Sequence, residues 1–289
     1  MAKCAFIGLG IMGYPMAGHL QAKGHEVCVY NRTSGKAEQW VGQHRGRSAP
    51  TPRQAAEGAE LVFMCVGNDD DIRSVAYGDD GALAGLAAGR VLVDHTTASA
   101  DIARELEAAA REQGKQFVDA PVSGGQAGAE NGVLTIMCGG EQAAFESARP
   151  AMEAYGRAVT LLGPAGAGQL TKMVNQICIA GLVQGLAEGI HFGKAAGLDI
   201  AKVIATISKG AAQSWQMENR WETMNRGEYG FGFAVDWMRK DLAICLAEAR
   251  QSGAKLPVTA LVDQFYADVQ EMGGRRWDTS SLLSRLERR

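Results

Sequence analysis

Short hydrophobic runs alternate with longer amphipathic segments through the first half of the chain. The runs are rich in Val, Ile, Phe and Leu, which is the composition of buried strands. We expect five strands, at 4–7, 27–30, 61–66, 91–94 and 116–119, and helices between them at 15–23, 35–42 and 101–113. This alternation predicts a parallel, doubly wound sheet with helices on both faces. The segments 132–138 and 158–162 resemble further strands at the sheet edge.

The pattern changes near Gly163, where a turn-rich stretch reaches Gly168. The next ~28 residues, 169–196, contain no strong helix breaker except isolated glycines, which predicts a helix ~42 Å long. Further helical patterns follow at 200–209, 237–252, 257–272 and 279–286, without a clear strand. We therefore expect an α/β domain at 1–163 and an all-helical domain at 164–289, joined by the long helix.

Composition narrows the classes of protein. A chain of 289 residues with 46% hydrophobic residues can bury two cores. The net charge is −3, and acidic and basic residues are interspersed along the chain without a large basic segment. We therefore expect no nucleic-acid partner. No apolar run of ~18 residues is apparent, so we expect no membrane span, and the N-terminus lacks the pattern of a signal peptide.

The six cysteines form no C-x-x-C pair, and each lies in an apolar run. They are interpreted as small buried hydrophobes of a reducing compartment, which favours a cytoplasmic protein without a metal site.

A glycine turn follows the first predicted strand and opens a helix. In a G-x-G-x-x-G turn the first glycine permits the sharp turn, the second allows a pyrophosphate to approach, and the third lets the helix pack on the strand. The N-terminus of the helix offers free N–H groups to the phosphates. We therefore expect a Rossmann domain that binds a dinucleotide through this segment: Gly8-Leu9-Gly10-Ile11-Met12-Gly13.

The residues after the second strand bear on which dinucleotide binds. An NAD site usually has Asp or Glu there, to accept a hydrogen bond from the ribose 2′-hydroxyl. Here the segment is Asn31-Arg32-Thr33, without a carboxylate. Arg32 could pair with a 2′-phosphate, and Asn31 and Thr33 could donate hydrogen bonds to it. The segment favours NADP(H), with NAD as the alternative.

Four motifs in order show what the chain resembles: FIGLGIMGYPM at 6–16, DAPVSGG at 119–125, G-x-G-Q-x-x-K-x-x-N at 166–175 and KDL at 240–242. It resembles the β-hydroxyacid dehydrogenase family, which includes 3-hydroxyisobutyrate dehydrogenase, tartronate semialdehyde reductase and glyoxylate/succinic semialdehyde reductase. The resemblance covers nearly the whole chain. It implies an active site in a cleft between the two domains, and a homodimer or homotetramer built through the helical domain.

The motifs contain groups suited to hydroxy acid chemistry. Ser123, Gly124 and Gly125 follow a strand and can form a nest of donors for a substrate carboxylate. Lys172 and Asn175 lie three apart and share a helix face. The resemblance makes Lys172 the general acid/base, and desolvation could lower its pKa toward ~7–8. Asn175 would orient the substrate or Lys172, and Ser123 would assist at the carboxylate.

The resemblance also assigns residues around these groups. Cys65 and Val66 would line the adenosine path, and Thr97 would contact the nicotinamide ribose or the substrate. Lys240 would lie at the nicotinamide side of the cofactor, and Asp241 beside the substrate. The segment 213–215 is distinctive to this chain and is not assigned by the resemblance; from its aromatic side chain we expect Trp215 to form a wall of the substrate pocket.

The predicted function is an NADP(H)-preferring oxidoreductase that interconverts a small 3-hydroxy acid and its oxo acid or semialdehyde. A Trp and a Gln at 213–215 also fit a 3-hydroxy amino acid such as serine. The main alternative is a glyoxylate/succinic semialdehyde reductase. An imine reductase or a non-catalytic binding module would usually lack Lys172. A 6-phosphogluconate dehydrogenase would have His and Asn where this chain has Asn175 and Gln176.

Overall fold

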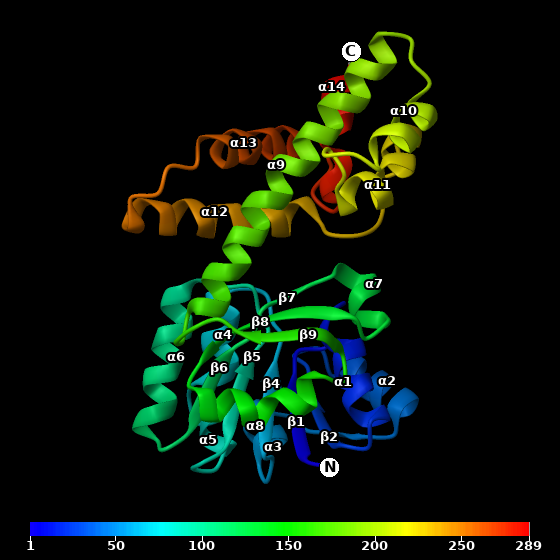
Figure 1. Ribbon diagram of the computed structural model, residues 1–289. Coiled ribbons are helices and arrows are strands. Elements are labelled where there is room, and N and C mark those ends of the chain that lie inside the picture. Colours follow the sequence, from blue (N-terminus) through cyan, green and yellow to red (C-terminus); the bar gives the residue numbers. More distant parts are fainter. Residues whose placement is uncertain (289) are drawn as a thin grey trace. The chain divides into compact units, whose positions relative to one another are not determined.

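The computed structural model describes residues 1–288, in two compact units, Met1–Lys172 and Met173–Arg289 (Figure 1). The first is an α/β unit and the second is helical. One helix, α9 (Ala167–Ala195), begins in the first unit and continues into the second. The fold class is therefore the expected one.

A nine-stranded sheet forms the centre of the first unit, in the order β3-β2-β1-β4-β5-β6-β8-β7, with β9 paired to β8. The strands from β3 to β6 are parallel, and β8 is antiparallel to β6. The order 3-2-1-4-5-6 of the parallel part is that of a dinucleotide-binding fold. The strands are β1 (Lys3–Ile7), β2 (Glu26–Tyr30), β3 (Arg47–Ser48), β4 (Leu61–Met64), β5 (Val91–Asp94), β6 (Gln116–Asp119), β7 (Val122–Ser123), β8 (Leu134–Gly140) and β9 (Gly156–Leu161).

Both faces of the sheet are covered by helices, as Figure 1 shows. Successive residues of a strand point to opposite faces. Phe6 and Phe63 accordingly belong to one hydrophobic cluster, and Ile7 and Met64 to a second cluster on the other face. The helices of this unit are α1 (Gly13–Ala22), α2 (Ser34–His44), α3 (Pro52–Ala56), α4 (Asp69–Ala76), α5 (Ala82–Gly85), α6 (Ala100–Glu112), α7 (Gly125–Glu130) and α8 (Gln142–Met152).

The sequence pattern missed several of these elements: α3, α4, α5, α7, α8, β3 and β7. Most span two to eight residues, shorter than the window of roughly 11–18 residues in which a hydrophobic period can be recognised. Helix α8 is longer, but it contains Pro150 and buries mostly alanines, so its apolar face is weakly marked.

The second unit contains α10 (Ile200–Ile207), α11 (Trp215–Arg226), α12 (Val235–Ser252), α13 (Pro257–Glu271) and α14 (Leu282–Glu287), with a short 3-10 helix at Thr279–Ser281. Helix α11 was not predicted, because it is strongly polar. The Ser214 hydroxyl caps it by accepting from the Met217 N–H, and Gly227 ends it in a left-handed conformation.

Helix α9 corrects one expectation. By length and composition alone, this helix is long and apolar enough to cross a membrane. The prediction that no such segment exists is therefore wrong. A single helix of this kind is weak support for a membrane span, because core helices have the same composition, and 44% of the apolar 18-residue window in α9 is buried.

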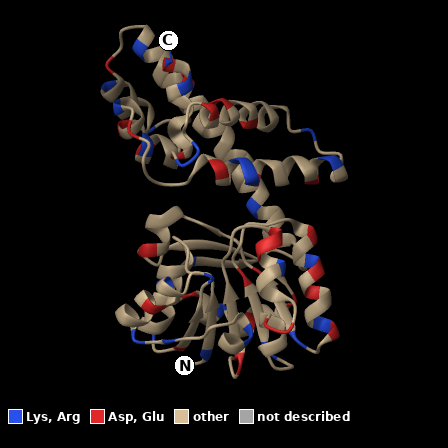
Figure 2. Ribbon diagram, turned by 180° about the vertical axis from the view of Figure 1, so that it is seen from behind, with Lys and Arg blue, Asp and Glu red and all other residues tan. Residues whose placement is uncertain are grey.

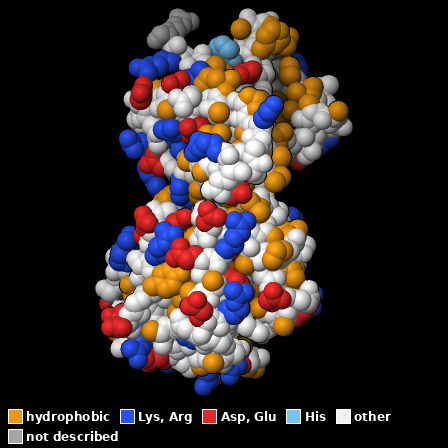
Figure 3. Space-filling model, turned by 90° about the vertical axis from the view of Figure 1, so that its left-hand side faces the viewer, with side chains coloured by type: hydrophobic (Ala, Val, Ile, Leu, Met, Phe, Trp, Pro, Cys, Tyr) orange, Lys and Arg blue, Asp and Glu red, His pale blue; other side chains and the backbone are white. Residues whose placement is uncertain are grey.

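The surface and the cysteines add two further observations. Residues of both charges are interspersed along the ribbons of both units (Figure 2), and Figure 3 shows hydrophobic side chains among charged ones on the face it presents. The prediction of buried cysteines holds for four of them. It is wrong for Cys178, which is exposed on α9, and for Cys65, which is half-buried.

Candidate active site

Most predicted site residues of the first unit lie at one edge of its sheet. The glycine turn follows β1, Asn31 follows β2, Cys65 follows β4, Thr96 and Thr97 follow β5, and Ala120 follows β6. Because these strands are parallel and adjacent, their carboxyl ends meet at the same edge. This edge is where open α/β sheets bind their ligands.

The glycine turn has the shape that a dinucleotide requires. Gly8 has a φ of +95°, and a Cβ there would lie 2.3 Å from the Cys65 carbonyl oxygen. A Cβ on Gly13 would lie 2.0 Å from the Gly8 carbonyl oxygen, so only glycine allows α1 to pack this closely. A Cβ on Gly10 would meet nothing within 4 Å. The open side of Gly10 fits an approaching pyrophosphate.

Asn31 connects the glycine turn to the end of β2. Its side-chain oxygen accepts a hydrogen bond from the Leu9 N–H at 2.9 Å, and its Nδ2 donates to the Thr33 carbonyl oxygen at 3.0 Å. The amide thus holds the turn in addition to the predicted cofactor contact. Arg32 is 85% exposed, and the Thr33 hydroxyl makes no capping hydrogen bond to α2.

The loop after β5 is held from two directions. The Thr96 hydroxyl accepts from the Val66 N–H at 3.0 Å, which connects it to the loop after β4. On the other side, Gln169 Nε2 donates to the Thr96 carbonyl oxygen at 2.7 Å, and Gln169 Oε1 accepts from the Ala98 N–H at 3.0 Å. The buried amide of Gln169 therefore brackets Thr97.

Asp119 fixes the first turn of α9. One carboxylate oxygen accepts from the Gly166 N–H at 2.7 Å, and the other accepts from the Gln169 N–H at 2.9 Å. A carboxylate at a helix N-terminus satisfies unpaired N–H groups and interacts favourably with the helix dipole. The start of the helix that carries Lys172 is thus attached to the end of β6.

The predicted carboxylate nest comes just after this point. Ser123 ends β7, and Gly124 and Gly125 have φ values of +139° and +62°, which favour glycine. The preceding backbone is held by His95, whose Nδ1 donates to the Ala120 carbonyl oxygen at 2.6 Å. Its Nε2 then accepts from the Tyr155 hydroxyl at 2.8 Å.

Burial shifts the pKa values of three titratable groups behind the site edge. Burial raises the pKa of Asp94 to about 7, although hydrogen bonds from Thr96 act in the opposite direction and lower this pKa. Burial raises the pKa of Asp119 to about 6, although peptide N–H groups at the start of α9 lower it. Burial lowers the pKa of His95 to about 4, so its ring is neutral near pH 7.

Lys172 and Asn175 lie one turn apart on α9, on the same side of the helix. Lys172 is only 7% exposed, which is rare for a lysine. Asn175 Nδ2 donates to Gln176 Oε1 at 2.8 Å. A desolvated amine suits proton transfer better than the amine of a solvated surface lysine does.

In the second unit, three residues form a chain of polar contacts. Gln176 Nε2 donates to Asp241 Oδ2 at 2.7 Å, and Lys240 Nζ lies 3.1 Å from Asp241 Oδ1. Asp241 is buried, so these contacts stabilise its charge. Trp215 begins α11, where its indole packs against the Arg220 guanidinium, 4.8 Å from the ring centroid.

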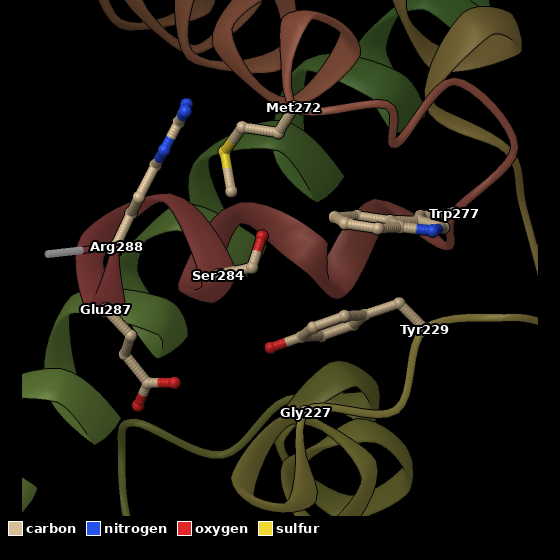
Figure 4. A pocket seen from close by; sticks show the side chains of 7 residues that line it. All are labelled: Gly227, Tyr229, Met272, Trp277, Ser284, Glu287 and Arg288. Atoms are coloured by element: carbon tan, nitrogen blue, oxygen red, sulfur yellow. The ribbon is translucent and has the colours of Figure 1, made fainter.

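A hollow of about 530 Å³ in the second unit contains none of the predicted site residues (Figure 4). The Tyr229 and Trp277 rings face one another there, with centroids 6.0 Å apart. That spacing brings the two rings into contact with each other.

Among the described residues 1–288, no group of three or more His, Cys, Asp or Glu is placed to hold a metal ion.

Sequence reasoning missed several residues that support the site. Asp119 and Gln169 lie within two of the four motifs, and this position could have marked them as site residues. Their partners could not be predicted, because the contacts join residues 47 to 73 positions apart. His95, two residues before Thr97, and Gln176, next to Asn175, carried no signal beyond being polar residues close to predicted site residues.

Comparison with known families covers nearly the whole chain. The family model described as the NAD binding domain of 6-phosphogluconate dehydrogenase matches residues 3–163. The model described as the NAD-binding domain of NADP-dependent 3-hydroxyisobutyrate dehydrogenase matches residues 166–286.

Three relatives align along almost their full length. An uncharacterized oxidoreductase of Shewanella frigidimarina is 67% identical over 288 residues, covering 100% of this chain and 99% of the relative. The NAD-dependent L-serine dehydrogenase of Pseudomonas aeruginosa is 37% identical, with 97% and 96% covered. The 2-hydroxy-3-oxopropionate reductase of Escherichia coli is 34% identical, with 99% and 97% covered.

Two solved structures have the same fold as this chain over nearly its full length. The 3-hydroxyisobutyrate dehydrogenase of Mycobacterium tuberculosis, solved with L-serine, has a TM-score of 0.90 and 27% identity, with 100% of both chains covered. Psf3, in complex with NADP⁺ and 2-OPP, has a TM-score of 0.88 and 27% identity, covering 98% of this chain and 99% of that one.

Proposed function

The chain belongs to the β-hydroxyacid dehydrogenase family, and from this premise we propose that it interconverts a small 3-hydroxy acid and its oxo acid, with NADP(H) as the preferred cofactor. Membership makes it an oxidoreductase that binds a nicotinamide dinucleotide. The observation that carries the finer proposal is Lys172, a buried lysine at the base of a helix that Asp119 and Gln169 attach to the site edge.

The proposed reaction needs a base, an anchor and a hydride carrier. A nicotinamide dinucleotide held at the glycine turn, Gly8–Gly13, would supply the acceptor for the hydride of the hydroxyl-bearing carbon. Lys172, as the neutral amine, takes the hydroxyl proton as the carbonyl forms, and returns it in the reverse direction. Ser123, Gly124 and Gly125 bind the substrate carboxylate, and Asn175 orients the substrate or the amine.

The proposed preference for NADP(H) depends on the end of β2. No carboxylate stands at residues 31–33, and the exposed Arg32 guanidinium, which pairs with Asp71, can also pair with a 2′-phosphate. The complex of Psf3 with NADP⁺ supports this preference. The L-serine dehydrogenase relative is NAD-dependent, which keeps NAD as the alternative.

For the substrate, we propose a 3-hydroxy acid whose C2 carries a methyl or an amino group, as in 3-hydroxyisobutyrate or serine. The L-serine dehydrogenase and the structure solved with L-serine favour the amino form. The reductase from Escherichia coli favours the alternative, an enzyme that reduces a semialdehyde.

A panel of substrates tests this proposal. NAD(P)H absorbance should be followed with serine, threonine, 3-hydroxyisobutyrate, glycerate and 4-hydroxybutyrate in the oxidative direction, and with glyoxylate and succinic semialdehyde in the reductive direction. We expect the highest kcat/KM with a 3-hydroxy acid and NADP⁺. Turnover restricted to glyoxylate and succinic semialdehyde would favour the alternative, and no turnover at all would contradict the proposal.

We also propose that the protein is a homo-oligomer in which α9 contacts a second copy. Val174, Leu182 and Phe192 are large hydrophobic side chains on α9, and all are exposed in the single chain. Cys178 is exposed between the first two at helical spacing, so Val174, Cys178 and Leu182 form one apolar stripe. Apolar stripes of this kind usually mark interfaces.

Leu182→Asp should therefore shift the mass measured by light scattering from an oligomer toward a monomer. Lys202→Asp, on an exposed side chain of α10, is the control and should leave the mass unchanged. A monomeric parent protein would contradict the proposed oligomer.

A further inference from the structure

An ion pair crosses the carboxyl edge of the sheet above the glycine turn. Arg32 follows β2, and Asp71 lies in the first turn of α4, after β4; Arg32 Nη1 is 3.3 Å from Asp71 Oδ1. In the sheet, β1 lies between β2 and β4. The pair therefore spans the end of the strand that carries the glycine turn, where the strand order reverses and dinucleotides bind.

The two partners are held very differently. The Asp71 N–H donates to Asn68 Oδ1 at 2.8 Å, so the residue is fixed by the cap of α4. That cap region is itself attached to the loop before α6, because Asp69 accepts hydrogen bonds from both the N–H and the hydroxyl of Ser99. Asp71 is 32% exposed, whereas Arg32 is 85% exposed on a long side chain. A ligand can thus draw Arg32 away while Asp71 stays.

We propose that Asp71 sets the balance between the two dinucleotides by competing with the cofactor's 2′-phosphate for Arg32. This inference depends on the proposed role of Arg32 in binding NADP(H). The phosphate must displace the Asp71 carboxylate from the guanidinium and then remains near that carboxylate, and both effects weaken its binding. An unphosphorylated ribose carries no such charge, and its hydroxyl can donate to a carboxylate.

The expected size of the effect is modest. Exposed ion pairs contribute little, because water screens them and the side chains lose freedom. Repulsion between the retained carboxylate and a phosphate adds to this, so we expect Asp71 to weaken NADPH binding about 3- to 10-fold. Salt should reduce the effect strongly, since the charges lie near solvent.

The test measures cofactor binding directly, without any substrate. NADPH and NADH are titrated into the full chain, with fluorescence as the readout, for the parent, Asp71→Asn, Arg32→Ala and the double variant. Asp71→Asn should lower the Kd for NADPH about 3- to 10-fold at low salt, and should leave the Kd for NADH unchanged or raise it slightly. In the Arg32→Ala background the same substitution should lose most of this effect.

Asp70→Asn is the matched control, since it makes the same charge change one residue away. Its side chain is 95% exposed and lies 3.5 Å from Arg73, not Arg32. It should change the Kd for NADPH by less than about 2-fold.

Equal changes in the Kd for NADPH in Asp70→Asn and Asp71→Asn would overturn the inference, because the loss of one negative charge anywhere in this region would then explain both changes. An unchanged ratio of the two Kd values in Asp71→Asn, or an undiminished effect in the double variant, would also overturn it. If Arg32→Ala binds NADPH as tightly as the parent, the proposed NADP(H) preference itself is wrong. If Arg32→Ala loses NADPH affinity while Asp71→Asn has no effect, only the present inference is wrong.

Discussion

The glycine turn and the base of α9 lie at the same edge of the sheet, but they are built in opposite ways. The turn is made by consecutive residues, from Gly8 to Gly13, and its shape is set by backbone that only glycine can adopt. The base of α9 is made by contacts between distant residues. Asp119 and Gln169 are 50 positions apart, and Gln169 and Thr96 are 73 apart.

Because of this difference, we expect cofactor binding and the positioning of Lys172 to depend on different residues. The turn offers backbone N–H groups to a phosphate whatever the rest of the site does. The side chain of Lys172, in contrast, is placed by a helix whose first turn depends on a buried carboxylate and a buried amide. Substitutions in the two regions should therefore have separable effects on cofactor affinity and on turnover.

The largest expected effect comes from Lys172→Ala. Removal of a general acid/base usually costs 10²- to 10⁴-fold in rate, and we expect a loss of kcat in that range. The Kd for NADPH should change by less than about 3-fold, because the glycine turn and Arg32 are untouched. Steady-state kinetics with the best substrate of the panel, together with a cofactor titration, measure both quantities.

Lys194→Ala is the control on the same helix. Its ammonium pairs with Glu287 in the second unit at 2.7 Å and has no proposed part in the reaction, so activity should stay within about 2-fold of the parent. Retention of activity in Lys172→Ala would contradict the assignment of the acid/base.

The same contrast explains what the sequence could predict. The turn, the strands around it and the long helix α9 show local patterns, so the dinucleotide fold was predictable from residues 4–30 and 163–196. Short helices such as α4 were not, since their stability comes from caps and packing. The contacts of Asp119, Gln169 and His95 depend on the folded arrangement of chain segments, which periodicity does not encode. Exposure of Cys178 was likewise unpredictable, because its neighbours are apolar and only packing decides which face is covered.

Asp119→Asn should have the next largest effect. One acceptor oxygen is replaced by an NH₂ group that faces a peptide N–H at the start of α9, so a charge-assisted hydrogen bond is lost. We expect the first unit to lose about 2 kcal/mol of stability. We also expect kcat to fall about 10-fold as Lys172 loses its fixed position, with the affinity for NADPH nearly unchanged.

Asp101→Asn is the control for this substitution, because Asp101 is an exposed carboxylate in the first turn of α6. Its effects on thermal stability and kcat should be small. A loss of NADPH affinity in Asp119→Asn as large as the loss of kcat would show that binding and positioning are not separable.

The smallest expected effect concerns the pH dependence that His95 contributes to the stability of the first unit. In the unfolded chain a histidine titrates near pH ~6.5, whereas burial lowers the pKa of His95 to about 4 in the folded protein. Between these values the unfolded chain binds a proton that the folded chain does not. The contribution of His95 to stability is therefore fully present above pH ~6.5, and is lost as the pH falls toward the folded pKa.

From pH ~7 to pH ~5.5 this loss amounts to about 1 kcal/mol, or roughly 2–4 °C in Tm. His95→Gln lacks the titration, so the difference in Tm between the parent and this variant should narrow over that interval. Asp94 and Asp119 act in the opposite direction, since burial raises their pKa values and their ionisation becomes unfavourable as the pH rises. Both carboxyl groups remain in His95→Gln, so the difference between the two proteins isolates the histidine. A constant difference in Tm across the interval would mean that His95 is protonated in the folded protein. The hydrogen bond from the Tyr155 hydroxyl to Nε2 would then be wrong, and with it the way in which the backbone before Ser123 is held.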